Sequence, residues 1–132
     1  MVRTPISERL LVTGGQDYAD AERMAIYLDA LHGSREIALL IHGASRGADE
    51  LADAWAKSRG VPVQSCPADW DAHGRSAGPI RDTIMLVDHC PTLMLAFPGG
   101  RGTANMVKKA REYGVPVIEE ATWRAAMLAQ TD

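Results

Sequence analysis

The sequence predicts an α/β domain of three layers, in which helices cover both faces of an open, mainly parallel sheet of five strands. Five short apolar runs are continuous rather than alternating in polarity, as in strands that are buried on both faces. Segments with the apolar spacing of helices separate these runs, which is typical of successive strand–helix–strand units. The length of 132 residues suits one ordinary domain, so we expect a single domain over residues 1–132.

The apolar runs are the predicted strands, and each lies at or close to a glycine or proline that interrupts regular structure. The predicted strands are Arg9–Thr13, Ile37–Ile41, Val61–Cys66, Thr92–Phe97 and Val115–Ile118. Continuous burial of this kind favours a sheet that is covered by helices on both sides.

The segments between and after these strands are the predicted helices, because their apolar residues recur every three or four positions. The predicted helices are Asp20–His32, Ala48–Arg59, Ile80–His89, Thr103–Tyr113 and Ala121–Gln130. Ile80, Ile84 and Val87 fall on one side of the third of them. The stretch Pro67–Pro79 is the only long one predicted to be irregular, and loops of this length are usually functional or mobile.

Composition and charge argue against several classes of protein. With 46% hydrophobic and 23% charged residues the chain is globular, and its net charge of -3 disfavours a sequence-independent nucleic-acid binder. No apolar run approaches the roughly 20 residues of a membrane span, and the stretch Met1–Glu8 is polar, so we expect a cytoplasmic protein with no membrane partner. Cys66 and Cys90 are predicted to be buried free thiols, and no cluster of cysteine and histidine predicts a metal site.

Four loops that follow predicted strands carry the residues with a chemical signal. In an open parallel sheet, ligands bind beyond the carboxyl ends of the strands, so these loops should converge on one edge. Three of the four loops are rich in glycine. They are Gly14-Gly15 and the segments 42–49, 67–70 and 98–103.

The clearest signal is the glycine-rich loop after the fourth predicted strand. Glycine lets the backbone approach a ligand closely, and the N–H groups that open the following helix are available to an anion. We therefore predict that this loop binds the phosphate of a ligand, with a plain tight turn as the alternative. Its residues are Pro98, Gly99, Gly100, Arg101, Gly102 and Thr103.

The loop after the second predicted strand repeats this pattern. Gly43 and Gly47 give the backbone freedom, and Arg46 offers a charge-assisted contact to a phosphate. Asp49 is a candidate ligand-binding residue, although its place at the start of a helix suits a capping role equally well. His42 ends the strand, and a hydrogen-bonded structural role is the main alternative to ligand contact.

Three candidate site residues lie outside the glycine-rich loops. Arg81 is near the start of a predicted helix, where a positive charge is unfavourable unless an anion lies nearby, and a surface role is the alternative. Trp70 either stacks on the base of a ligand or packs the long loop onto the core. Asp69, on the same loop, is the carboxylate chosen as a catalytic candidate with Arg81, because that loop is long enough to fold over a ligand.

Taken together, these motifs resemble the YspA branch of the YpsA-related SLOG superfamily. The resemblance runs from about Leu10 to Ile118 and also includes His73-Gly74 and the segment 77–81, Ala-Gly-Pro-Ile-Arg. It implies a Rossmann-like fold and a nucleotide or nucleotide-derived ligand. It also implies a homodimer, because SLOG relatives often form dimers or higher assemblies.

The same superfamily contains the Lonely Guy phosphoribohydrolases, which cleave the N-glycosidic bond of nucleoside 5′-monophosphates. Their signature reads Pro-Gly-Gly-x-Gly-Thr-x-x-Glu, preceded by Arg-x-x-x-Met. Arg81 and Met85 match the second pattern, and the loop 98–103 matches the first, but Met106 stands where those enzymes have Glu. A thioether cannot act as a base, so hydrolysis would need another carboxylate, for which Asp49, Asp69 and Asp82 are the candidates.

Three hypotheses of function follow. The first is a binding module that holds a nucleotide-type small molecule as a sensor or sequestering protein, and Met106 favours it. The second is a nucleotide N-glycosidase that uses Arg81 and a carboxylate other than the missing Glu. The third is DNA handling, as in the related recombination mediator DprA, which the net charge of -3 disfavours. We expect no cofactor.

Overall fold

A parallel sheet of five strands runs through the centre of the molecule in the order β3-β2-β1-β4-β5. The computed structural model describes residues 7–129. All four pairs of neighbouring strands are parallel, which confirms the predicted open sheet. The strands are β1 (Ser7–Thr13), β2 (Glu36–His42), β3 (Val63–Ser65), β4 (Leu93–Ala96) and β5 (Val117–Glu119).

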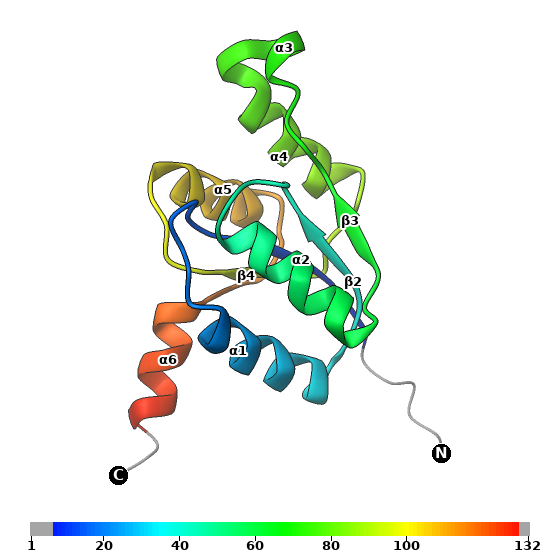
Figure 1. Ribbon diagram of the computed structural model, residues 1–132. Helices are drawn as coiled ribbons and strands as arrows, with labels where there is room; N and C mark the ends of the chain where they lie inside the picture. The colour runs from blue at the N-terminus through cyan, green and yellow to red at the C-terminus, as the bar shows by residue number, and fades with distance from the viewer. Residues whose placement is uncertain (1–6, 130–132) are drawn as a thin grey trace.

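Helices cover both faces of the sheet (Figure 1), as the α/β prediction requires. Along the chain, β2 and then β3 are added on one side of β1, and β4 and then β5 on its other side. Because crossovers between parallel strands are right-handed, this reversal places α1 and α2 on one face and α4 and α5 on the other. The helices are α1 (Ala21–Ser34), α2 (Ala48–Arg59), α3 (Trp70–His73), the 3₁₀ helix η1 (Gly74–Ser76), α4 (Ala77–Val87), α5 (Arg101–Glu112) and α6 (Glu120–Ala129).

The central strands are buried on both faces, which explains their continuous apolar sequences. Successive side chains of a strand point to opposite faces, so Leu10 packs with α1 and α2 while Leu11 packs with α4 and α5. Leu40 and Ile41 divide between the two layers in the same way. The alternation produces two hydrophobic clusters, one on each side of the sheet.

The predicted elements agree closely with those of the structure, and they differ mainly at the ends. The predicted helix 48–59 is α2 without change, whereas the predicted strand 61–66 shortens to β3. The last predicted helix corresponds to α6, although Gln130 lies outside the described residues. None of the helices within residues 7–129 has the length and apolarity to cross a membrane.

The prediction of an irregular stretch over residues 67–79 is wrong, because most of it is helical. The Asp69 carboxylate accepts a hydrogen bond from the Ala72 N–H, 3.0 Å away, and so caps α3. Helix α4 begins at Ala77 rather than at Ile80. Pro79 is compatible with this start, since a residue in the first turn of a helix has no intrahelical use for an N–H group.

The apolar stripe of α4 lies on the outer face of the helix. Ile80, Ile84 and Val87 are 36%, 41% and 50% exposed, while Met85 and Leu86 face the sheet. Cys66 is buried as predicted, whereas Cys90 is exposed. Cys90 lies in the turn between α4 and β4, where its φ is 47°. The expected homodimer stays a prediction.

Candidate functional site

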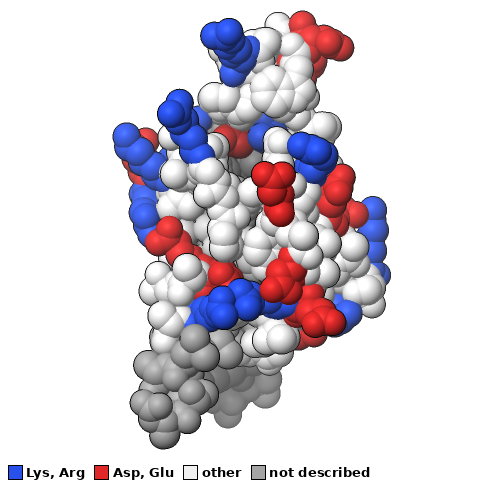
Figure 2. Space-filling view, turned by 60° about the vertical axis from the view of Figure 1, so that its left-hand side comes forward, with Lys and Arg blue, Asp and Glu red and all other residues white. Residues whose placement is uncertain are grey.

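The strand order places a crevice between the loops that follow β1 and β4. In sheets of this kind the ligand site lies beyond the strand ends at the point where the strand order reverses, which here falls between β1 and β4. A cavity of about 370 Å³ opens there. Figure 2 shows the surface hollowed beneath the projecting upper end of the molecule.

Nine of the residues predicted for the site line this cavity. They are Gly14, Gly15, Gly43, Asp49, Trp70, Arg81, Gly100, Gly102 and Thr103. They come from the ends of β1, β2 and β4 and from α2, α3, α4 and α5, so the fold brings together residues that are up to 89 positions apart.

The β1–α1 and β4–α5 loops pack directly against each other. The Gly15 N–H donates to the Pro98 carbonyl at 2.9 Å, and the Phe97 N–H donates to the Thr13 carbonyl at the same distance. A Cβ atom on Gly99 would lie 2.7 Å from the Gly15 nitrogen and would overlap the Thr103 side chain. The folded structure therefore explains the glycine at position 99 without any ligand.

Gly100 and Gly102 differ from Gly99, since a Cβ atom at either position would meet no other atom within 4 Å. Gly100 has a φ of -97°, which other residues adopt readily. Both glycines border the cavity, and no side chain caps α5. The first N–H groups of α5 therefore remain without helical partners beside an open space, an arrangement that binds anions.

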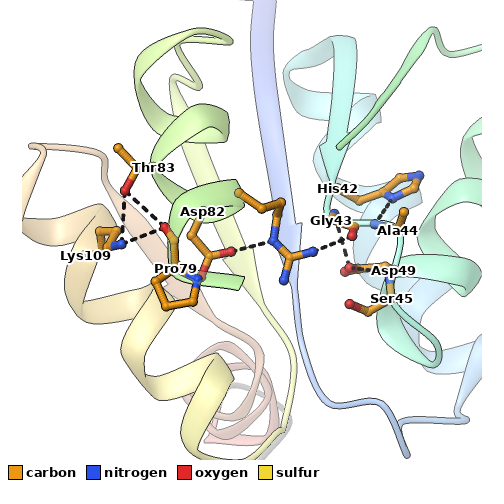
Figure 3. Close-up of polar contacts among 10 residues, drawn as sticks. His42, Gly43, Ala44, Ser45, Asp49, Pro79, Asp82, Thr83 and Lys109 are labelled. Carbon is orange, nitrogen blue, oxygen red and sulfur yellow. Dashed lines mark hydrogen bonds and ion pairs between the residues drawn. The ribbon is translucent and has the colours of Figure 1, made fainter. Parts of the chain in front are cut away.

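The β2–α2 loop is held in place by Asp49. Its Oδ2 atom accepts hydrogen bonds from the N–H groups of Gly43, at 3.1 Å, and Ser45, at 3.2 Å (Figure 3). The side chain is buried, and this burial raises the pKa of Asp49, while the Ser45 N–H, His42 and Arg81 favour its charged form. Asp49 therefore shapes the loop from within, and it also borders the cavity.

Gly47 joins the same loop to the β1–α1 loop without bordering the cavity. Its φ is 75°, and a Cβ atom would run into the carbonyl oxygens of Gly15 and Gln16. The neighbouring Ala48 N–H donates to the Gly15 carbonyl at 3.1 Å. A glycine is needed here so that two strand-end loops can meet.

Arg81 connects α4 to the β2–α2 loop across the cavity. Its Nε atom donates to Asp82 at 2.8 Å, and its Nη1 atom donates to the Gly43 carbonyl at 2.5 Å. Figure 3 draws these two bonds as the dashed lines that end at the labelled Asp82 and Gly43. Gly43 makes this approach feasible, because a Cβ atom there would lie 2.6 Å from the guanidinium. Among the described side chains and the backbone of residues 7–129, no acceptor is hydrogen-bonded to the Nη2 atom, so one end of the guanidinium remains available to a ligand.

Other predicted residues lie outside the cavity and support the loops around it. His42 accepts the Ala44 N–H at Nδ1, so its neutral ring carries the proton on Nε2, which lies 2.8 Å from Asp53. Arg46 donates weakly to Gln16 at 3.4 Å, and Asp69 caps α3. Pro98 and Arg101 also do not border the cavity.

Several lining residues were not predicted as site residues. Gln16, Ser45 and Asn105 border the cavity as polar groups. Asp82, which the sequence offered only as an alternative carboxylate, and Met85 and Met106, which appeared only in the signature comparison, also line it. Helical spacing would have placed two of these residues at the cavity. Asp82 and Met85 follow Gly78 by four and seven positions, which places all three on one face of α4.

Trp70 borders the cavity from the projecting end of the molecule. The side chain is 60% exposed, and its Cη2 atom lies 3.6 Å from the position of a Cβ atom on Gly78. Neither α3 nor η1 contributes a buried residue. We name this exposed segment, residues 70–76, the arm.

Three known proteins or families are similar to this chain. A family model described as "YspA, cpYpsA-related SLOG family" matches residues 8–73, which is half of the chain. The Gene 61 protein of Mycobacterium phage D29 is 37% identical over 118 residues, which cover 83% of this chain and 94% of the phage protein.

A solved structure also matches part of this chain. The phosphoribosylglycinamide formyltransferase purN from Coxiella burnetii, in complex with CHES, is 14% identical, with a TM-score of 0.43. The similarity covers 74% of this chain, which spans 43% of the formyltransferase.

Proposed function

The chain belongs to the YspA, cpYpsA-related SLOG family, and on this basis we propose that it binds a nucleotide or nucleotide-derived phosphorylated small molecule in the cavity between β1 and β4. The phosphate binds at residues 100–103. The observation that carries the proposal is the contrast between Gly99, which the packing requires, and Gly100 and Gly102, which it does not. Two glycines that leave open space beside a helix N-terminus suit a ligand that approaches the backbone closely.

The charges around the cavity support a ligand that carries both a phosphate and a sugar. The first turn of α5 and the free end of Arg81 attract an anion. Asp49 and Asp82 add carboxylate oxygens, which accept hydrogen bonds from hydroxyl groups and repel a phosphate. The phosphate is therefore bound on the α5 side, while sugar hydroxyls are bound near the two carboxylates. A volume of about 370 Å³ is within the usual range for small-molecule sites.

A binding or sensing role is favoured over catalysis by Met106. This side chain is buried and borders the cavity at the position where the Lonely Guy signature has Glu. A thioether neither accepts a proton nor stabilises a developing positive charge as a carboxylate does. The ligand is therefore held without being converted.

A nucleotide N-glycosidase is the second candidate function, and the position of Asp82 favours it. Asp82 lies in the cavity, paired at 2.8 Å with Arg81, and Asp49 lines the same space. Asp69 does not border this cavity and is engaged in capping α3, so either Asp49 or Asp82 is the better candidate for the acid. Release of free base from a nucleotide, measured by chromatography, distinguishes this candidate from the binding module.

The phosphate site is tested by adding bulk at Gly100. We expect Gly100→Val to fold normally, because nothing lies within 4 Å of its Cβ position, and to lose the rise in melting temperature that nucleoside monophosphates give the wild type. Gly33→Val is the matched control, since Gly33 is exposed on α1 and equally uncrowded. Equal stabilisation of the Gly100→Val and Gly33→Val variants by nucleotides would overturn the proposal.

A further inference from the structure

Trp70 is unusual because the fold gives it so little to pack against. At 60% exposure it is, together with Ile26, the most exposed large apolar side chain among the described residues. The arm that carries it contains no buried residue, so the core does not explain an indole at this position. An exposed tryptophan at the edge of a ligand cavity is instead typical of a surface that gains a partner on binding.

The position of the indole is nevertheless defined. Asp69 caps α3, which begins at Trp70, and the Cη2 atom of the six-membered ring lies 3.6 Å from where a Cβ atom on Gly78 of α4 would be. A methyl group at position 78 would therefore be in ordinary van der Waals contact with the ring. The side of the indole that faces away from α4 remains available.

Two methionines in the cavity lining also suit a flat, polarizable group. Met85 lies two turns along α4 from Gly78, on the same face of the helix, and borders the cavity with Met106 of α5. Thioether sulfurs make favourable contacts with aromatic rings. The cavity lining thus includes the start of α5, one indole and two thioethers.

We infer that Trp70 is a stacking platform for the heteroaromatic ring of the ligand, so that the ligand class is nucleoside phosphates and not sugar phosphates. This inference rests on the proposed phosphate site, because the ring subsite is occupied only by a ligand held at residues 100–103. Any of the bases can stack on an aromatic side chain, since every base has a π-face. Such stacking changes affinity by about 5- to 150-fold.

The experiment compares ligands that differ only in the ring. Ribose 5-phosphate, AMP, GMP, CMP and UMP are titrated by calorimetry against the wild type and the Trp70→Ala, Trp70→Phe and Ile26→Ala variants. We expect the wild type to bind the best nucleotide about 5- to 150-fold more tightly than ribose 5-phosphate. Trp70→Ala should remove this preference for the nucleotide without changing the affinity for ribose 5-phosphate. Trp70→Phe should retain most of the preference.

Two controls separate stacking from a change in the fold. Ile26→Ala removes an equally exposed apolar side chain from α1 and should keep the wild-type ratio. Tryptophan fluorescence of the wild type should be quenched by the best nucleotide and unchanged by ribose 5-phosphate. The quenching should disappear in Trp70→Phe, although Trp55 and Trp123 remain.

The possible failures can be told apart. If the wild type binds ribose 5-phosphate and the nucleotides equally, or if Trp70→Ala keeps the wild-type ratio, the ring subsite is overturned and the phosphate site is not. If the wild type binds none of the five compounds, both the ring subsite and the proposed function are overturned.

Discussion

The cavity has two walls, and they are stabilised in different ways. One wall consists of the loops after β1, β2 and β4, which are linked to one another by backbone hydrogen bonds such as those from Gly15 to Pro98 and from Ala48 to Gly15. The other wall includes the arm, whose residues are all exposed. Arg81 connects the two walls through its bond to the Gly43 carbonyl. Under the proposed function, we therefore expect the phosphate side to be formed before a ligand binds, and the arm to gain contacts on binding.

The largest difference is expected between the two tryptophans Trp55 and Trp70. Trp55 is buried in α2 and donates from its indole nitrogen to Asp29 at 2.9 Å, so Trp55→Ala should cost about 3–5 kcal/mol of unfolding free energy. Trp70→Ala should cost less than about 1 kcal/mol, because little surface is buried there. Urea denaturation of both variants measures these losses of unfolding free energy. A loss of several kcal/mol in Trp70→Ala would show that the arm is part of the core.

Two of the four described glycines with positive φ, Gly47 beside the cavity loops and Gly74 in the arm, provide the next comparison. Gly47 and Gly74 have φ values of 75° and 54°, but only Gly47 is crowded by backbone atoms. Backbone strain should cost about 1–3 kcal/mol in either alanine variant. The loss of unfolding free energy in Gly47→Ala should exceed this range, because the loops at the strand ends must also move apart. Similar unfolding free energies for Gly47→Ala and Gly74→Ala would contradict the proposed difference between the walls.

Arg81 tests the connection between the walls. Arg81→Ala leaves Asp82 and the Gly43 carbonyl without their donor, which should cost about 1–3 kcal/mol. Under the proposed function, the variant should also lose the stabilisation that we expect nucleotides to give the wild type. The matched control is Arg75→Ala, on the exposed arm, which should change stability by less than about 0.5 kcal/mol. Nucleotide stabilisation that survives in Arg81→Ala would remove Arg81 from the site.

The smallest effect is a difference in pH dependence between two carboxylates on α2. Burial raises the pKa of Asp49, so the folded protein binds its proton more readily than the unfolded chain and loses stability as pH rises past the ordinary value. Lys57 and His42 lower the pKa of Asp53, whose stabilising contribution is instead lost as pH falls.

Melting temperatures at pH 4 and pH 7 measure this difference in variants that keep the side-chain shape. Relative to the wild type, Asp49→Asn should be more stable at pH 7 than at pH 4, and Asp53→Asn should show the opposite trend. The fixed cost of each substitution cancels when the two pH values are compared. Parallel pH profiles of the two variants would contradict the assignment of opposite shifts.

The sequence alone predicted the sheet and most helices because burial on two faces leaves a direct pattern in the chain. Leu10 and Leu11 are both apolar because both faces are covered, and the spacing in α2 matches its buried side. The arm left no such pattern, since none of its residues is buried. Its helical structure depends on one capping contact from Asp69, which the sequence does not distinguish from a loop residue.

The candidate site was predictable at the level of loops and not at the level of side chains. The rule that ligands bind at strand ends identified the glycine-rich segments. It could not reveal that Gly99 is fixed by packing while Gly100 is not, because the atoms that crowd Gly99 include the Gly15 nitrogen, which lies 84 positions away in the chain. Likewise, the sequence does not indicate that His42 turns toward Asp53.

The central position of β1 has a consequence for how the chain is made. β1 pairs with β2, about 30 residues later, but its other edge is completed only by β4, some 83 residues after it. On a ribosome, the first half of the sheet therefore exists for a time with an apolar strand edge open to solvent, and such edges promote aggregation. Chains that are cut short before residue 93 should be aggregation-prone even when α1 and α2 have formed.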